Sequence, residues 1–239
     1  MTAVLPKFHL YISDTKVDEY FQQLPRSLLS KIAPDRFRLS ALGIEIGIRR
    51  KGANTTKYEK LNAIISYLRE TDEVGTPDAP KGYFEGTLPM RSDMIFHDGI
   101  MVCYGAVMPG RSMLRVVVLA GSAHHVVGKM QARPAPERKL VHDCYSRDVT
   151  DIALAARRQL MQQSPTLEAA FAGRPLHEVQ DDIHVLIKVA DELPEPMQFH
   201  RFFAKTLYVA NVTHEFVRGG KPTRVQFLLG TPFFVALGR

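Results

Sequence analysis

The chain of 239 residues has only two cysteines and no long hydrophobic run. Neither Cys103 nor Cys144 belongs to a Cys-x-x-Cys pair, so we expect reduced thiols rather than a disulfide framework, and a cysteine nucleophile is disfavoured. No stretch approaches the roughly 18 apolar residues of a membrane-spanning helix, and the first residues lack the pattern of a secretory signal. We therefore predict a cytoplasmic protein that does not cross a membrane.

Several familiar signatures of catalysis and cofactor binding are also missing. The sequence contains neither the Walker pattern nor Gly-x-Gly-x-x-Gly, and it lacks the Gly-x-Ser-x-Gly elbow of serine hydrolases. Asp181, Asp182 and His184 lie close together on a predicted helix, but no second pair of metal ligands with matching spacing accompanies them. We favour a solvated acidic helix face there, and we expect no metal and no cofactor.

Charge is present in slight basic excess, with 31 Lys and Arg against 25 Asp and Glu, which gives a formal net charge of +6. This excess favours anionic partners. The basic residues are spread over several segments, which is typical of solvated loops and helix faces, with an anion-binding rim as the alternative. Nucleic acid stays open as a partner, as do a protein partner and a homo-oligomer.

The first third of the chain is predicted to alternate strands and helices. Residues 8–13 favour a buried strand, followed by a helix that Ser13 or Asp14 can cap. Residues 37–50 show the alternation of a second strand, and residues 55–70 have the apolar spacing of a helix with Thr55 or Thr56 as its cap. The prolines and glycines of residues 75–82 then predict a loop.

The rest of the chain is predicted to be an antiparallel meander followed by a helical block. Apolar runs at residues 83–90, 101–108 and 113–120 are separated by Asp98-Gly99 and Pro109-Gly110, which suit tight turns. Helical spacing follows within residues 152–160, 176–190 and 197–209, and residues 223–229 favour a closing strand. We predict a single mixed α/β domain of residues 1–239 with a central mixed or antiparallel sheet flanked by helices. Its sub-lobes are residues 1–74, 83–128 and 148–239.

The leading candidate site is a glycine and hydroxyl at the end of the most apolar strand. Gly121 and Ser122 follow residues 114–120, and Gly230 and Thr231 follow the closing strand in a similar local order. Such a turn can present backbone N–H groups to phosphate or carboxylate, although an ordinary turn is the simpler interpretation. Two interpretations stay open: the similarity of the two segments arises by chance, or two strands of one sheet end in equivalent Gly-hydroxyl turns.

Further polar side chains extend this candidate site. His124 and His125 are adjacent, so their rings diverge and are poorly placed to share a metal, while either one could act as a general acid or base. A serine nucleophile at Ser122 is the weaker alternative. Ser13, Asp14 and Lys16 follow the first strand, where α/β folds often bind ligands, and Arg91 could clamp an anion at the rim of the meander. A helix cap and a surface ion pair are the respective alternatives.

Four segments in order carry a resemblance that spans nearly the whole chain. These are YISDTKVD at residues 11–18, YFEGTLPMR at 83–91, GSAHHVVG at 121–128 and LGTPFFVA at 229–236. Together they resemble an uncharacterised bacterial domain family, chiefly actinobacterial, which implies one full-length cytosolic module and no particular chemistry. From the residues we predict a ligand-sensing or interaction module that binds an anionic small molecule such as a nucleotide. A hydrolase or nuclease using His124 or His125 is the first alternative, and a structural scaffold is the second.

Overall fold

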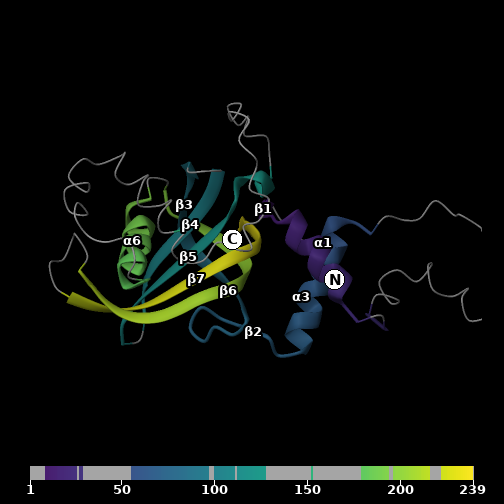
Figure 1. Ribbon diagram of the computed structural model, residues 1–239, viewed down its shortest axis with the longest axis horizontal. Coiled ribbons are helices and arrows are strands. Elements are labelled where there is room, and N and C mark those ends of the chain that lie inside the picture. The colour runs from purple at the N-terminus through teal and green to yellow at the C-terminus, as the bar shows by residue number, and fades with distance from the viewer. Residues whose placement is uncertain are drawn as a thin grey trace, which may run out of the picture. The chain divides into compact units, whose positions relative to one another are not determined.

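A computed structural model of the protein describes residues 9–25, 27–28, 55–96, 100–110, 112–127, 152, 179–193, 196–215 and 222–238 (Figure 1). The chain divides into two compact units, one of residues Ser13–Val74 and one that joins Met1–Ile12 to Gly75–Arg239. The strand predicted within residues 37–50 lies outside the described residues. The same is true of the helix predicted at residues 152–160, apart from Ile152, and of the Asp98-Gly99 turn.

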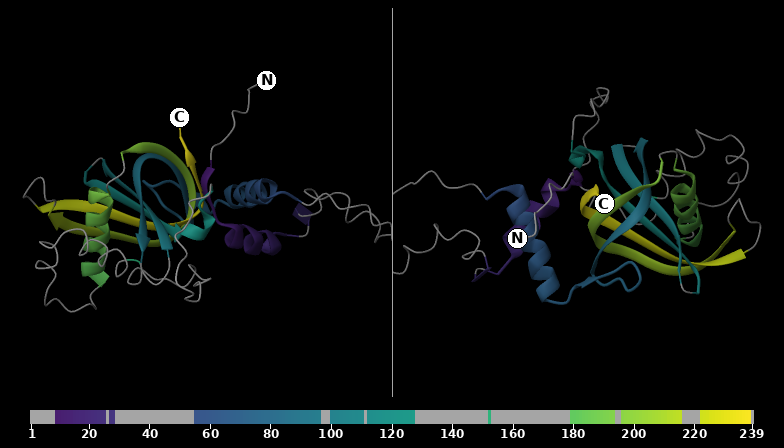
Figure 2. Two further views of the ribbon diagram at one scale, coloured as in Figure 1. Left: turned by 90° about the horizontal axis from the view of Figure 1, so that it is seen from above. Right: turned by 180° about the vertical axis from the view of Figure 1, so that it is seen from behind.

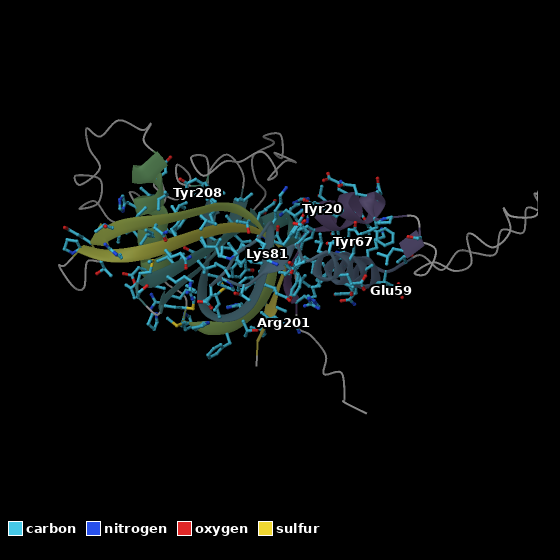
Figure 3. The ribbon with its side chains drawn as sticks, turned by 90° about the horizontal axis from the view of Figure 1, so that it is seen from below. Tyr20, Glu59, Tyr67, Lys81, Arg201 and Tyr208 are labelled. Carbon is cyan, nitrogen blue, oxygen red and sulfur yellow. The ribbon has the colours of Figure 1, made fainter. Side chains whose placement is uncertain are left out.

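The smaller unit contains helix α1 (Asp14–Gln23) and helix α3 (Lys57–Glu70). The predicted cap of α3 is confirmed at Thr56, whose side chain accepts from the Glu59 N–H while the Glu59 carboxylate accepts from the Thr56 N–H at 2.7 Å. These hydrogen bonds lower the pKa of Glu59, which is labelled in Figure 3. At α1, Ser13 stands in the predicted cap position, but its hydroxyl makes no capping hydrogen bond.

The larger unit is built on a sheet whose described strands number seven. The predicted meander is confirmed, because β3 (Tyr83–Phe96), β4 (Ile100–Pro109) and β5 (Leu114–Ser122) pair antiparallel in succession. Strand β1 (His9–Ile12) matches the first predicted strand. The other strands are β2 (Val74–Gly75), β6 (Gln198–Glu215) and β7 (Pro222–Leu237).

The pairings close the larger strands into a ring. The sheet order is β1-β7-β5-β4-β3-β2, and β6 pairs with both β3 and β7. Following the partners from β3 through β4, β5, β7 and β6 therefore leads back to β3, and the strands curl accordingly in Figure 2. Only β5 and β7 run parallel within this ring. The fold is mixed α/β, as predicted.

One predicted helix is wrong. Residues 197–209 have helical spacing of their apolar residues, but Gln198–Glu215 form the long strand β6. The segment is rich in aromatic and β-branched residues, which favour strands. Its first half pairs with β3 on one side and β7 on the other, so two ladders of backbone hydrogen bonds override the local helical pattern. The predicted helical block is therefore interrupted by a strand.

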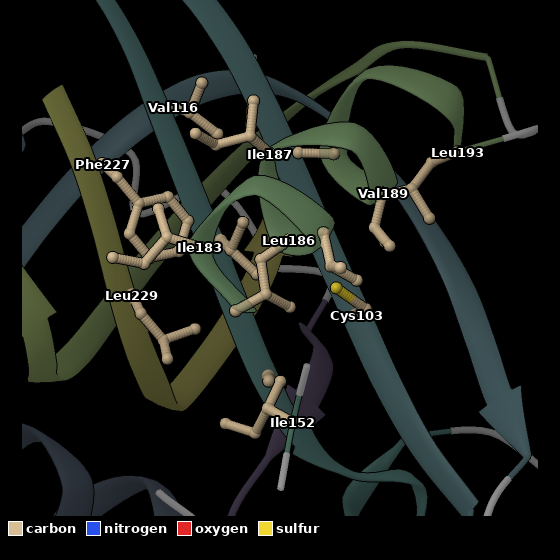
Figure 4. Close-up of a cluster of buried hydrophobic side chains, with 14 of the residues drawn as sticks. Cys103, Val116, Ile152, Ile183, Leu186, Ile187, Val189, Leu193, Phe227 and Leu229 are labelled. Atoms are coloured by element: carbon tan, nitrogen blue, oxygen red, sulfur yellow. The ribbon is translucent and has the colours of Figure 1, made fainter. Parts of the chain in front are cut away.

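Strand β5 lies between two hydrophobic clusters. Val116, Val118 and Ala120 belong to the cluster covered by helix α6 (Val179–Glu192), which confirms the helix predicted at residues 176–190 (Figure 4). Val117 and Leu119 belong to the other cluster, which includes the side chains of Tyr11, Phe84, Phe202 and Leu228. Burial on both faces explains why this strand is an unbroken apolar run rather than an alternating one.

No helix within the described part of the chain is both long enough and apolar enough to span a membrane.

Candidate functional site

The turn that ends β5 is fixed by hydrogen bonds on both sides. Residues Ala123–His125 form one 3₁₀ turn, in which the Ser122 hydroxyl oxygen accepts from the His124 backbone N–H at 3.4 Å. The N–H of Val127 donates to the carbonyl of Leu10 at 2.8 Å, and Val126 forms a bridge with Tyr11. The turn is therefore tied to strand β1, a segment more than a hundred residues away in the sequence.

Gly121, one of the predicted ligand-binding residues, lies in close contact with a buried aromatic ring. It is still a residue of the sheet, where it pairs with Val102 of β4. A Cβ atom at this position would lie 2.5 Å from Tyr11 Oη and 2.7 Å from its Cζ. Because the buried phenol of Tyr11 occupies the space beside Gly121, only glycine lets the two strands approach so closely.

The second predicted turn, at Gly230 and Thr231, is wrong. Both residues lie inside β7, which continues without a break to Leu237. Gly230 is opposite Leu119 of β5, and Thr231 is buried opposite Lys205 of β6. A Cβ at Gly230 would lie 2.6 Å from two ring carbons of Phe84, so this glycine also makes room for an aromatic ring. The strand continues because β6 pairs with it on the far side.

The two adjacent histidines have different surroundings. His124 is exposed, whereas His125 is partly buried with its ring edge-on to Tyr11 at a centroid separation of 5.9 Å. Their own rings are 6.5 Å apart and lie at 80° to one another. The Ser122 hydroxyl oxygen accepts its hydrogen bond from the His124 backbone N–H and not from the ring of His124 or His125. This geometry leaves His124 as the side chain presented outward.

The remaining candidates are placed elsewhere. Ser13, Asp14 and Lys16 belong to the smaller unit, where Asp14 forms an ion pair with Lys57 of α3, and Ser13 and Lys16 are buried. Arg91 Nη1 donates to the carbonyl oxygen of Asp191 at 2.8 Å, next to the C-terminal end of α6. A guanidinium there satisfies a helix-end carbonyl and complements the helix dipole. The contact gives Arg91 a structural role.

Cys103 is a poor candidate for a nucleophile. It is fully buried in β4, within the cluster beneath α6. Burial, together with the negative charge of Asp93, raises the pKa of this thiol to about 12. Since the thiolate is the reactive form, the thiol is inert near neutral pH. Cys144 lies outside the described residues.

One pair of polar side chains escaped the sequence prediction. His184 of α6 and His214 of β6 approach each other with their Nδ1 atoms 2.8 Å apart. Burial, followed by the neighbouring His184, lowers the pKa of His214 to about 4. The period-two spacing of Tyr208, Ala210, Val212 and His214 could have signalled this strand face. Within the described ranges, no three His, Cys, Asp or Glu side chains gather in a way that could hold a metal ion.

Comparison with known proteins gave one match. A family model described as a family of unknown function, DUF7019, matches residues 7–239. No curated protein and no solved structure matches the chain.

Proposed function

We propose that this chain, which belongs to the family of unknown function DUF7019, is a ligand-sensing or interaction module. Its ligand is an anionic small molecule. The site is the turn that ends β5, where Ser122 and His124 are the contacting residues. The observation that carries the proposal is the exposed His124 ring on a turn held by Ser122 and by β1. A fixed backbone reduces the entropy lost when a ligand binds.

The donors at this turn suit an anion. The Ser122 hydroxyl oxygen accepts from the backbone, so its own O–H can still donate to a ligand. The exposed His124 ring, two residues further along the same turn, adds an N–H donor. The net charge of +6 favours the approach of negatively charged molecules. Phosphate-bearing metabolites, nucleotides among them, are the ligand class that fits these donors.

The contacts favour binding over covalent catalysis. A serine nucleophile needs a base that accepts its proton, and the hydrogen bond described for the Ser122 hydroxyl is to the backbone N–H of His124 and not to a histidine ring. The buried Cys103 thiol is held in its protonated form. Binding requires only the donors and the fixed turn, so it is the simpler function for these residues.

The first prediction tests this site by thermal unfolding of the full chain with inorganic phosphate and with nucleoside mono- and triphosphates. A ligand at about 100 times its Kd stabilises the native state by roughly 2.7 kcal/mol, which raises the melting temperature measurably. We expect a shift with at least one of these probes, and we expect His124→Ala to abolish it. Arg201→Gln, which removes an exposed positive charge from β6, is the matched control and keeps the shift.

Any of four results would contradict the proposal. If no anion shifts the melting temperature, or if His124→Ala and the wild-type chain respond alike, the turn is not the binding site. Turnover of a nucleotide that disappears in His124→Ala would instead support the hydrolase alternative. A shift lost equally in Arg201→Gln would indicate a general effect of charge.

A further inference from the structure

His184 and His214 join the helix α6 to the strand β6 across a large distance in sequence. Their ring planes differ by 21° and their centroids are 5.1 Å apart, while the Nδ1 atoms are 2.8 Å apart. The centroid separation exceeds the Nδ1–Nδ1 distance by the sum of the two centre-to-nitrogen distances within the rings. The Nδ1 atoms therefore lie between the rings and point at each other, as in an N–H···N hydrogen bond, rather than stacking face to face.

This hydrogen bond holds one shared proton. One Nδ1 carries hydrogen and donates it, and the other Nδ1 accepts with its lone pair. In the neutral donor ring Nε2 carries no hydrogen, so a first added proton can go to that atom and leave the bond intact. A second added proton must go to the accepting Nδ1, which removes the lone pair and faces two positive rings at close range. Uptake of the second proton therefore breaks the bond.

Within the described part of the chain, the charged groups that act on His214 oppose one another. On α6, Asp191 favours the protonated form of His214, while Lys188 and the His184 ring disfavour it. On the β7 side, the residue opposite His214 is Thr223, which carries no charge. Burial is the largest of the effects that disfavour the protonated form of His214. The pKa of His214 is therefore lowered from 6.5 to about 4.

Buried apolar side chains pack along the whole of α6, Ile183 and Leu186 among them, whereas its polar and close backbone contacts differ between the two halves. Near the C-terminal end of α6, the Arg91 side chain donates to the Asp191 carbonyl oxygen. The backbone of Ala190 lies close to Gly105, since a Cβ added to Gly105 would be 2.7 Å from Ala190 Cα. In the N-terminal half of α6, the hydrogen bond from His184 joins the helix to His214, near the C-terminal end of β6. Tyr208, Ala210 and Val212 are partly buried on this strand, against the cluster that α6 covers.

We propose that His184 and His214 form a proton-sensitive clasp, which holds the N-terminal half of α6 on β6 and releases it when the pair takes up its second proton. The C-terminal end stays docked through Arg91 and Gly105. Release uncovers the partly buried side chains of β6. Acidification is thereby coupled to a local opening of the larger unit, independently of the turn that ends β5.

The direction of the pH effect follows from linkage. Because the pKa of His214 is lowered in the folded state, the unfolded chain binds more protons once the pH falls below 6.5. The stability contributed by the clasp is complete above that pH and is lost as the pH falls towards about 4. Removing either histidine removes the same contribution, since the pair titrates as one unit.

The second prediction tests the clasp with the full chain at pH values from 8 to 4. Hydrogen exchange of α6 amides in the wild-type chain should accelerate at least tenfold more in the N-terminal half than near Ala190 as the pH falls, after correction for intrinsic rates. His214→Phe and His184→Gln should each remove this pH-dependent difference. Arg201→Gln, which removes an exposed charge from β6 outside the pair, is the control and should keep the wild-type profile.

A measurement on the unaltered chain keeps the test decisive if a variant fails to fold. In a ¹⁵N NMR titration of the histidine rings, His184 and His214 should titrate in two coupled steps, with the second well below pH 6.5. Independent titration of both rings near their ordinary pKa would overturn the proposal. So would uniform acceleration along α6, or an unchanged pH profile in both His214→Phe and His184→Gln.

Discussion

The segments around Gly121 and Gly230 look alike in sequence and occupy neighbouring parallel strands, yet their backbones do different things. Strand β5 ends one residue after Gly121, at Ser122, and the chain turns towards β1. Strand β7 runs through Gly230 and continues to Leu237. What the segments share is an aromatic ring packed where a side chain would start, Tyr11 in one and Phe84 in the other.

The comparison shows that a glycine required for close packing does not by itself make the chain turn. Glycine in both segments lets a buried ring approach the backbone, and that requirement is local to one contact. Whether the chain then turns depends on its partners, because β6 continues alongside β7 as far as Leu237 while β5 loses its β7 partner after Leu119. A glycine and a hydroxyl after an apolar strand are therefore not sufficient to predict an anion-binding turn.

Among the substitutions that compare these two segments, Gly230→Ala should lower the free energy of unfolding the most. Its Cβ would lie 2.6 Å from two ring carbons of the buried Phe84 and 3.1 Å from the Lys205 carbonyl oxygen, so both a side chain and a backbone must move. Overpacking of this kind costs about 1–3 kcal/mol, and we expect the upper half of that range in denaturant unfolding. Adding Phe84→Leu should make the double variant lose less than the sum of the single losses. Strict additivity would contradict the assigned contact.

Gly121→Ala should be destabilising but milder, by about 1 kcal/mol. Its Cβ would meet the outer end of the Tyr11 ring, with the hydroxyl oxygen at 2.5 Å and Cζ at 2.7 Å, and it lies near the end of β5. Tyr11→Phe removes only the nearest atom, so it should rescue Gly121→Ala partially in the same unfolding assay. A loss equal to or larger than that of Gly230→Ala would break the proposed contrast.

The two hydroxyls should give the smallest effects and a final contrast. Ser122→Ala removes an acceptor whose 3.4 Å contact is long, so we expect about 0.5 kcal/mol, the low end for a capping residue. Thr231→Val alters a buried side chain in the centre of the sheet and should cost about 1 kcal/mol or more. Chemical denaturation of both variants measures the difference. An equal or larger loss at Ser122 would show that the turn is held mainly by its hydroxyl.

Local signals predicted the elements whose stability is local. The cap at Thr56, one of the two predicted positions, the apolar stripe of α3 and the turn residues Pro109 and Gly110 all act within a few residues, and each matches the structure. The apolar run of β5 likewise indicated a central strand. At the candidate site, the sequence correctly brought Ser122 and His124 to the end of that strand.

The missed features depend on partners that are distant in the chain. Residues 197–209 show helical spacing, and only pairing with β3 and β7 makes them a strand. Once that strand was missed, His214 could not be placed opposite His184. The hydroxyl of Ser13 stands at a helix start and still does not cap it, which no local rule for serine anticipates.

The sequence by itself determined where α3 begins, which strands form the meander, and that a glycine, a hydroxyl and two histidines follow β5. Those features rest on hydrogen bonds and apolar spacing within one segment. Only the tertiary structure decided that Tyr11 covers Gly121, that β7 continues through Gly230, and that the Nδ1 atoms of His184 and His214 meet between α6 and β6. Each of these depends on contacts between residues that are far apart in the chain.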